Sequence, residues 1–383
     1  MSVYLDNAAT TRLDSRVLAK MKPYLTTKYA NASSIHRLGQ EAYGELLEAK
    51  KKVAKILHGE AENIVFCSSA TEANNFIIKG VARANRQRGN KIIISNIEHP
   101  CVRESAHELA DEGFKIEFVP VDANGLVKPE ALSKLVDRDT ILVSIIAVNN
   151  EIGTIQDIAA LAKIAHGAGA YFHTDAVQAV PYLNLDIKKM ALDFLTLSAH
   201  KFYGPKGVGL AYLNRAVKIR PLIVGGGQEE GYRSGTYNLP GIIGLAAALD
   251  LAYKEQKTYL REVKGLRDYF WQKIKKEISD VKLNGSWTKR SPANLNVMFK
   301  NIEGEAILID LSSRGVYVST GSACSATNLK SSHVLRAIGL DKNYLNSNIR
   351  FSLGRFNTRR EIDYTLKCLK DTVKRLRSFS PIN

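Results

Sequence analysis

Polar side chains follow several short apolar segments of the sequence, at positions where a strand would end. The segment CSSATEANN, at residues 67–75, is rich in small and hydroxyl residues and opens a helical pattern. Free N–H groups and the dipole at the start of a helix can bind an anion such as phosphate. Ser69 or Thr71 would equally well serve as an ordinary N-cap. The segment is therefore a candidate phosphate site, with helix capping as the alternative.

His99, Asp175 and Lys201 each come after another short apolar run. An imidazole at such a place can stack on a flat ring or move a proton, although a single His more often has a structural role. A carboxylate after a buried strand needs a cation or hydrogen bonds, and Asp175 would otherwise cap the next turn. Lys201 follows Asp175 by 26 residues, one strand–connection–strand unit. Both can face one crevice, unless Lys201 is only a surface charge.

Short apolar strands alternate with helical segments between residues 60 and 215. This alternation predicts βαβ units and a mostly parallel, seven-stranded sheet with both faces buried. Ligands of such sheets bind beyond the carboxyl ends of the strands. We expect strands over 64–67, 91–95, 115–120, 140–148, 170–173, 194–197 and 208–213, and helices over 72–88, 102–112, 129–136 and 157–167.

A long helix over 241–278 should lead from this sheet to a second unit. The pattern then predicts strands over 294–299, 316–319 and 348–353 and helices over 305–312, 331–338 and 358–378. We therefore expect an α/β protein with two domains. The large domain would span 15–260, and the smaller α+β domain would comprise 1–14 and 261–383 with a loop at about 319–330.

The formal charge of the 383-residue sequence is +16, and it is unevenly distributed. Residues 251–383 hold 25 Lys/Arg and 12 Asp/Glu, against 29 and 26 in residues 1–250. A basic surface attracts acidic partners or RNA, but it is also typical of solvated helices. No zinc-finger spacing or RNP-like strand is present, so we do not expect direct nucleic-acid binding. Apolar runs are short and no secretory signal is visible, which predicts a cytoplasmic protein without membrane contact.

The candidate residues fit one kind of ligand. A pyridine aldehyde phosphate needs a lysine for a Schiff base, and an anion that keeps its ring nitrogen protonated. It also needs a flat group against the ring and donors for its phosphate. Lys201, Asp175, His99 and the segment 67–75 supply these four functions.

The sequence resembles the pyridoxal-phosphate-dependent cysteine desulfurases of the NifS/IscS-like family, within the class-V aminotransferase superfamily. This resemblance covers residues 4 to about 356. It implies fold type I of pyridoxal-phosphate enzymes, a homodimer, and conversion of L-cysteine to L-alanine. The motifs that carry it are YLDNAATT, NASSIH, SSATEANN, EH, VNNEIGTIQDI, DAVQ, SAHKFYGPKGVG, GGGQEEGYRSGT, STGSACSAT, SSHVLRAIGL and IRFSLGRF.

The resemblance also implies a role for each matching residue. Lys201 would form the Schiff base with pyridoxal 5'-phosphate, Asp175 would pair with its ring nitrogen, and Gln178 with its ring hydroxyl oxygen. His99 would stack on the ring and assist proton transfer. The phosphate would be held by Ala70, Thr71, Ser198 and His200, and by Thr236 of the neighbouring subunit. The substrate would be bound by Arg350, Asn150 and Asn31, and Asn150 would also lie beside the cofactor.

Cys324 is the expected sulfur acceptor. It lies in a small, polar stretch, SACSAT, which predicts a mobile and exposed loop, and exposed thiols are suited to reaction. The resemblance implies a persulfide on Cys324, with sulfur passed to an iron–sulfur scaffold protein or another acceptor, or used for tRNA thiolation. Cys324 would be at most a transient cluster ligand, so no stable metal is expected. Cys67 and Cys368 read as core residues, and Cys101 as a packing residue or a second reactive thiol.

Other functions are compatible with parts of this pattern. A selenocysteine lyase, or a related aminotransferase, would use the same lysine and aspartate, although an aminotransferase has no use for Cys324. A catalytically silent binding subunit would rely on the basic C-terminal third instead.

Overall fold

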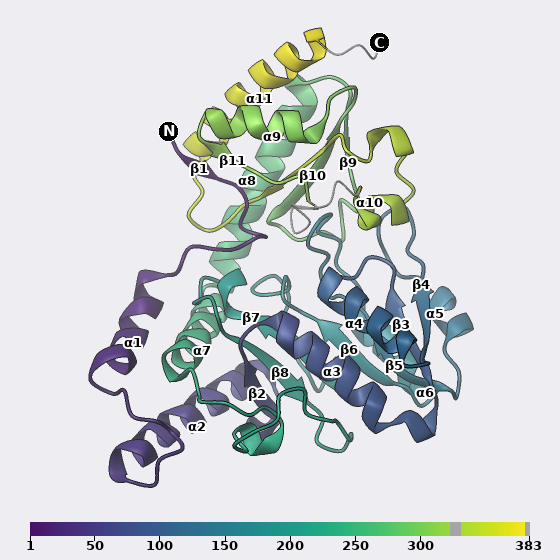
Figure 1. Cartoon of the computed structure of the whole chain (residues 1–383). Helices are drawn as coiled ribbons and strands as arrows, with labels where there is room; N and C mark the ends of the chain where they lie inside the picture. Colours follow the sequence, from purple (N-terminus) through teal and green to yellow (C-terminus); the bar gives the residue numbers. More distant parts are fainter. Residues whose placement is uncertain (322–330, 380–383) are drawn as a thin grey trace.

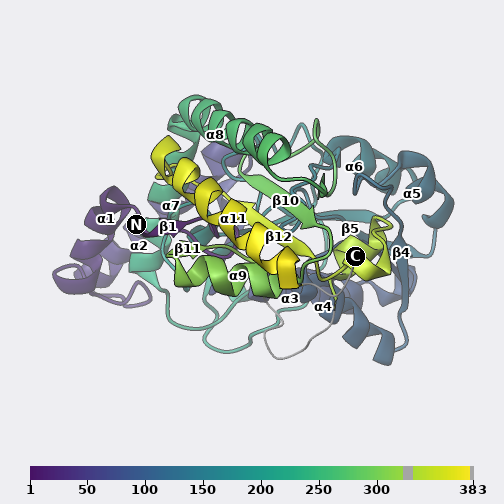
Figure 2. The same cartoon turned by 90° about the horizontal axis from the view of Figure 1, so that it is seen from above.

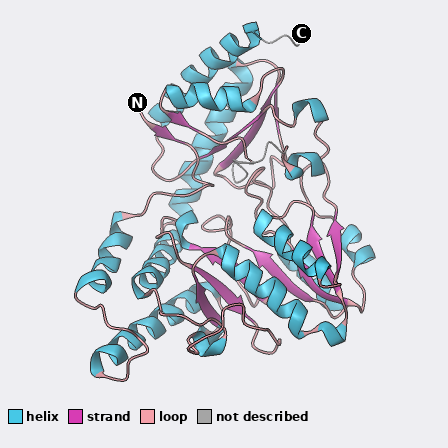
Figure 3. Ribbon diagram, in the orientation of Figure 1, coloured by secondary structure: helices cyan, strands magenta, loops and turns pink. Residues whose placement is uncertain are grey.

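The computed structural model describes residues 1–321 and 331–379, so Cys324 and most of its predicted loop lie outside the described residues. Within this part of the chain, strands form one sheet of seven, one of three and one of two. Figure 3 shows the large sheet in the lower half of the molecule and the small sheets above it. The cavity described below uses residues from both halves.

The large sheet has the strand order β2-β8-β7-β6-β5-β3-β4. β8 alone runs opposite to the other six described strands of this sheet, which confirms the prediction of a mostly parallel seven-stranded sheet. The expected strand over 140–148 leaves the regular ladder after Ser144, although Ile145 and Ala147 still donate to carbonyls of β6. The bounds are β2 Ile64–Cys67, β3 Lys91–Ser95, β4 Lys115–Val119, β5 Thr140–Ser144, β6 Tyr171–Asp175, β7 Phe194–Ser198 and β8 Gly209–Leu213.

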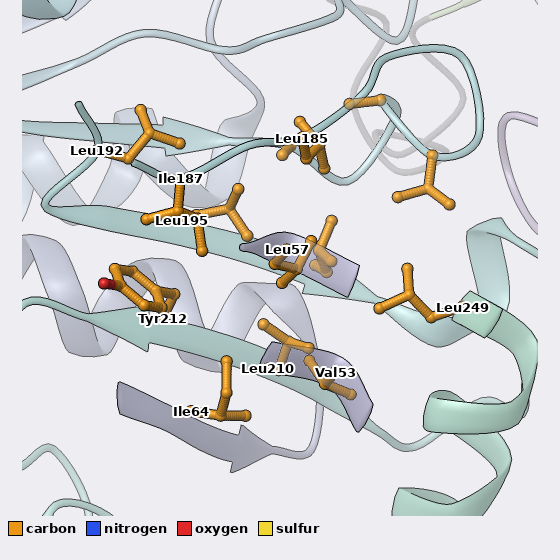
Figure 4. Packing of buried hydrophobic residues seen from close by; sticks show 14 of the residues in the cluster. Val53, Leu57, Ile64, Leu185, Ile187, Leu192, Leu195, Leu210, Tyr212 and Leu249 are labelled. Atoms are coloured by element: carbon orange, nitrogen blue, oxygen red, sulfur yellow. The ribbon is translucent and has the colours of Figure 1, made fainter. Parts of the chain in front are cut away.

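Successive side chains of a strand point to opposite faces of the sheet, and in strands such as β2, β3, β5, β7 and β8 the side chains on both faces are buried. In β2, Ile64 packs in one apolar cluster, with α2 and α7, and Val65 packs in another, with α3 and α4. Figure 4 shows Leu57 and Leu195 in the first cluster. The sequence patterns do not predict α1 and α2. The helix bounds are α1 Ser15–Thr26, α2 Arg37–Leu57, α3 Ala70–Ala84, α4 Pro100–Asp111, α5 Pro129–Leu135, α6 Ile158–Gly167 and α7 Leu239–Lys254.

A second apolar core lies above the large sheet and includes the start of the chain (Figure 1). Seen from above, α11 crosses β10 and β12 beside α9 (Figure 2). Val3 and Leu5 pack in the same cluster as Phe270 and Phe351. The elements are β1 Val3–Tyr4, α8 Gln256–Glu277, β9 Val281–Leu283, β10 Asn294–Phe299, α9 Gly304–Ser313, β11 Val316–Tyr317, α10 His333–Ala337, β12 Asn348–Ser352 and α11 Arg359–Phe379. The domain boundaries at residues 14 and 260 remain a prediction.

The single helix expected over 241–278 is two helices, α7 and α8, which meet at Glu255. The reason is that the two helices pack in different cores: Leu249 lies in the core of the large sheet and Phe270 in the second core. The Glu255 carboxylate pairs with Arg16 and Arg355 at the junction. Among the described helices, none is both long enough and apolar enough to cross a membrane.

Gly209, the first residue of β8, lets this strand pack directly on the turn that opens α3. A Cβ atom at Gly209 would lie 2.6 Å from the carbonyl carbon of Ser69 and 2.9 Å from the amide nitrogen of Ala70. Gly209→Ala should therefore lower the free energy of unfolding by about 1–3 kcal/mol, the usual cost of overpacking. Urea denaturation followed by circular dichroism measures this change.

Gly265 offers the matched control, because it lies in the exposed part of α8 and a Cβ there would meet nothing within 4 Å. Gly265→Ala should raise the free energy of unfolding by about 0.5–1 kcal/mol through helix propensity. A Gly209→Ala protein as stable as the wild type would show that the turn is not tightly packed.

Candidate active site

A cavity of about 310 Å³ lies beyond the carboxyl ends of the central strands of the large sheet. Residues from the start of the chain, Ala8 and Ala9, and Gly321 from the second half close it from the other side. Most of the residues predicted from the sequence therefore share one cavity. Those that line it are Ala70, Thr71, His99, Asn150, Asp175, Gln178, Ser198, His200, Lys201 and Arg350.

Asp175 ends β6 and is only 3% exposed. Its Oδ2 accepts a hydrogen bond of 2.8 Å from Asn74 Nδ2, and its Oδ1 accepts one of 3.0 Å from the Val177 amide. Hydrogen bonds of this kind compensate the cost of burying a carboxylate. Asp175 can thus present a fixed negative charge to the cavity.

Lys201 lies in the short 3-10 turn Ala199–Lys201 that follows β7. Its Nζ donates to the carbonyl oxygens of Ala8 at 2.6 Å and Ala9 at 2.8 Å. Gln178 Nε2 donates to the same Ala8 oxygen at 2.9 Å. The first residues of the chain therefore position the lysine and the glutamine at the cavity wall.

The start of α3 forms another wall of the cavity. Ser69 caps this helix, its Oγ accepting from the Glu72 amide at 3.2 Å, so the N-cap alternative is correct for Ser69. Thr71 and the neighbouring Ala70 line the cavity at the same helix end. Burial, with the charges of Lys201 and Lys206, lowers the pKa of His200 to about 4, so His200 offers a neutral ring.

His99 is the N-cap of α4, and its Nδ1 accepts a hydrogen bond of 3.2 Å from the Cys101 amide. Because Nδ1 is an acceptor, the proton of the neutral imidazole is on Nε2. Burial lowers the pKa of His99 below its ordinary value; the charge of Asp175 opposes this effect and that of Lys201 adds to it. The neutral ring suits stacking on a flat ligand.

Arg350, in β12, is 4% exposed and lines the cavity from the second half of the molecule. Its Nη2 donates to Asp6 Oδ1 at 2.8 Å and its Nη1 to the Asn150 carbonyl at 3.0 Å. Its buried Nε has no hydrogen-bond partner among residues 1–321 and 331–379. A guanidinium with a remaining donor can bind a carboxylate.

The structure does not bring every predicted residue to this cavity. Thr236 and Asn31 are exposed and do not line it. Their roles stay predictions. Cys324 lies outside the described residues, so its role also stays a prediction. Cys67 and Cys368 are buried, which confirms them as core residues. Cys101 lines the cavity instead of only packing in a core.

Two groups that hold the predicted residues were not assigned a role from the sequence. Asn74 binds Asp175, and Asp6 pairs with Arg350. Both residues lie inside quoted motifs, SSATEANN and YLDNAATT, which were the only signal. The described residues contain no group of three or more His, Cys, Asp or Glu side chains that would hold a metal ion.

Similarity to known proteins identifies the family of this chain. The family model of class-V aminotransferases matches residues 3–365, so this chain belongs to the class-V aminotransferase family. It is 47% identical over 379 residues to a cysteine desulfurase IscS of Dictyoglomus turgidum, covering 99% of this chain and 96% of the relative. It is 44% identical over 381 residues to the cysteine desulfurase IscS of Methanosarcina thermophila, covering 100% and 94%.

Solved structures show the same fold over nearly the whole chain. A NifS-like protein has a TM-score of 0.93 at 41% identity and covers 98% of this chain and 100% of its own. The structure named "SspA in complex with cysteine" has a TM-score of 0.82 at 33% identity and covers 93% and 100%. The expected fold, type I of pyridoxal-phosphate enzymes, is thereby confirmed.

Glu98, beside His99, is a buried acid whose ionisation should affect stability. Its Oε1 accepts from the Ile146 amide at 2.7 Å and from Ser95, whereas its buried Oε2 has no partner among the described residues. Burial raises the pKa of Glu98 to about 8. An acid with a raised folded-state pKa keeps its proton while the unfolded chain releases it. Stability therefore falls as the pH rises from about 4.5 to 8.

Glu98→Gln removes this penalty and keeps an acceptor for Ser95 and Ile146. The free energy of unfolding of the variant, relative to the wild type, should increase by more than about 1 kcal/mol between pH 5 and pH 8. Urea unfolding at both pH values measures the difference. Parallel pH profiles for the two proteins would contradict a protonated Glu98.

Proposed function

We propose that this chain is a cysteine desulfurase that takes sulfur from L-cysteine as a persulfide on Cys324 and releases L-alanine. One observation carries the proposal: Lys201, Asp175 and Arg350 share a single cavity. This is the donor set that an amino-acid substrate and a pyridine cofactor need. The proposal is supported by relatives at 44–47% identity, which are named cysteine desulfurases.

The cavity residues fit pyridoxal 5'-phosphate. Asp175 would face the ring nitrogen, because its carboxylate is fixed by two hydrogen bonds and lines the cavity. His99 would lie against the ring, and Gln178 beside the ring hydroxyl. The phosphate would be held at the start of α3 by Ala70 and Thr71, with Ser198 and His200. When bound, this cofactor supplies an electron sink that stabilises negative charge at the substrate Cα.

Lys201 would hold the cofactor covalently and would serve as the base for the substrate. Its Nζ lies at the cavity wall, where the Ala8 and Ala9 carbonyls orient it. Its amine would take the proton from the substrate Cα and return it at the end of the reaction. His99, with its proton on Nε2, assists proton transfer.

Arg350 and Asn150 position the substrate. The Arg350 guanidinium is fixed by Asp6 and by the Asn150 carbonyl, and its cationic face lines the cavity. We assign the substrate carboxylate to Arg350. A fixed guanidinium restricts the substrate to one orientation, with Cα near Lys201.

Cys324 receives the sulfur. Its thiolate attacks the Sγ of the substrate, so an S–S bond forms while the Cβ–Sγ bond breaks. The electron pair of that bond stays on the substrate carbon, which is protonated to give the methyl group of alanine. Gly321, which lines the cavity, brings the chain to within three residues of Cys324.

The oligomeric state and the sulfur acceptor are also part of the proposal. The protein would be a homodimer in which Thr236 reaches the phosphate site of the neighbouring subunit, and Asn31 contributes to substrate binding. Cys324 would pass its sulfur to an iron–sulfur scaffold protein in the cytoplasm, serving at most as a transient cluster ligand. Transfer to a tRNA-thiolating acceptor is the alternative use of the sulfur.

Cys324→Ala tests the sulfur transfer. Sulfide release from L-cysteine with a reductant should fall by at least about 100-fold, because the nucleophile is lost. Mass spectrometry of the wild type after mixing with L-cysteine should find one additional sulfur on Cys324. The control Cys368→Ala removes a buried thiol that does not line the cavity and should keep the wild-type rate. Undiminished sulfide release by Cys324→Ala would refute the mechanism. A strong preference for selenocysteine over cysteine would instead indicate a selenocysteine lyase.

Lys201→Ala tests the assignment of the base. Turnover should fall by about 10³-fold or more, because both covalent attachment and proton transfer are lost. The visible absorption band of the lysine-bound cofactor should disappear. Lys206 is exposed in the same segment, so Lys206→Ala should keep both the band and most of the activity. Near-normal turnover by Lys201→Ala would exclude Lys201 as the base.

A further inference from the structure

Asn74 connects two of the proposed cofactor contacts. It is fully buried on α3, and its Nδ2 donates to Asp175 Oδ2 at 2.8 Å and to Cys101 Sγ at 3.1 Å. Its Oδ1 accepts from Thr196 Oγ1 at 2.7 Å. Both N–H groups of the amide are used and the carbonyl is occupied, so the orientation of the side chain is fixed.

Cys101 continues this chain of hydrogen bonds to His99. Its Sγ lies 3.0 Å from His99 Nδ1. Because Nδ1 already accepts from the Cys101 amide, the ring nitrogen is an acceptor and the thiol is the donor. Burial, with the charge of Asp175, raises the pKa of Cys101 to about 12. The thiol therefore keeps its proton at neutral pH, which argues against a second nucleophile.

We propose that Asn74 and Cys101 are positioning residues that link Asp175 to His99 and keep His99 Nδ1 as an acceptor. The inference rests on the proposed function, in which Asp175 and His99 contact the cofactor. The bonds run from Thr196 through Asn74 to Asp175, and from Asn74 through Cys101 to His99. One buried amide thus fixes the orientation of the anion and, through the Cys101 thiol, supports a second donor to the ring nitrogen that the Cys101 amide already makes an acceptor.

The link has a measurable electrostatic consequence. Two donors on Nδ1 stabilise the neutral imidazole, so losing the thiol donor favours protonation of His99. The charged or titratable groups that act on this ring from packed elements are Asp175 on β6, Lys201 after β7 and His333 on α10. Replacing Cys101 leaves these groups in the protein but removes a partner of Asn74, so a second variant that keeps a donor at position 101 is needed to attribute the change to the thiol.

The first experiment compares Cys101→Ala and Cys101→Ser in the full-length protein. Histidine-selective ¹⁵N NMR across pH, with His99 assigned from its lost signal in His99→Gln, reports the tautomer and pKa of the ring. In Cys101→Ala the pKa of His99 should rise by about 0.5 to 1. In the cofactor-loaded enzyme kcat should fall about 3- to 10-fold with KM for cysteine nearly unchanged. Cys101→Ser, whose hydroxyl can donate to Nδ1, should restore both values.

The second experiment tests the amide. Asn74→Leu keeps the approximate size but removes the donor to Asp175, so the pH at which the visible band of the bound cofactor changes should shift. Asn75→Leu is the matched control, because the Asn75 side chain bonds to Thr71 O within its own helix. It should leave the pH dependence of the band as in the wild type.

The outcomes separate this proposal from the proposed function. Identical His99 titration in Cys101→Ala and the wild type would overturn the link, even if the enzyme is an active desulfurase. A persulfide on Cys101 would also overturn it, because the thiol would then be a nucleophile. A shifted His99 titration in a protein without desulfurase activity would support the link and refute the proposed function.

Discussion

The arrangement of the cavity depends on burying the Asp175 carboxylate at the end of β6. An isolated buried carboxylate is unstable by several kcal/mol, so its partners must be in place whenever the protein is folded. The Val177 amide supplies one hydrogen bond and Asn74 the other. Asn74 is in turn fixed by Thr196 in β7, so α3, β6 and β7 must keep one relative position. The same constraint sets where the start of α3 meets the cavity.

The first residues of the chain connect this sheet to the second core. Val3 and Leu5 pack with the second core, and β1 pairs with β11. A few residues further on, the Ala8 and Ala9 carbonyls accept from Lys201, at the edge of the large sheet. Asp6 lies between these contacts and holds Arg350 of β12. A short N-terminal segment therefore determines the distance between the proposed base and the proposed carboxylate site.

The sequence predicted best what local patterns determine. Buried strands such as β3 are continuous apolar runs between polar ends, so their bounds and the ionisable residues after them could be inferred directly. Neither α1 nor α2 was predicted; α2 is rich in charged residues, with eight of 21, whereas α1 is not. The break at Glu255 depends on Arg16 and Arg355, which are distant in sequence. Likewise Asn74 and Asp6 bind partners 101 and 344 residues away, and no local pattern announces such contacts.

Burial decides the chemistry of the Cys101 thiol. Cys101 lies where desolvation and the Asp175 charge disfavour a thiolate. The thiol therefore stays protonated and can only donate or accept hydrogen bonds. A thiolate nucleophile needs the opposite surroundings, and the small polar neighbours of Cys324 in the sequence favour such exposure. In the proposed mechanism a thiolate beside His99 would compete for the substrate sulfur, so a protonated Cys101 would leave Cys324 as the acceptor. The side-chain amide of Asn74 has two N–H groups, so it can donate one hydrogen bond to the thiol and one to the carboxylate.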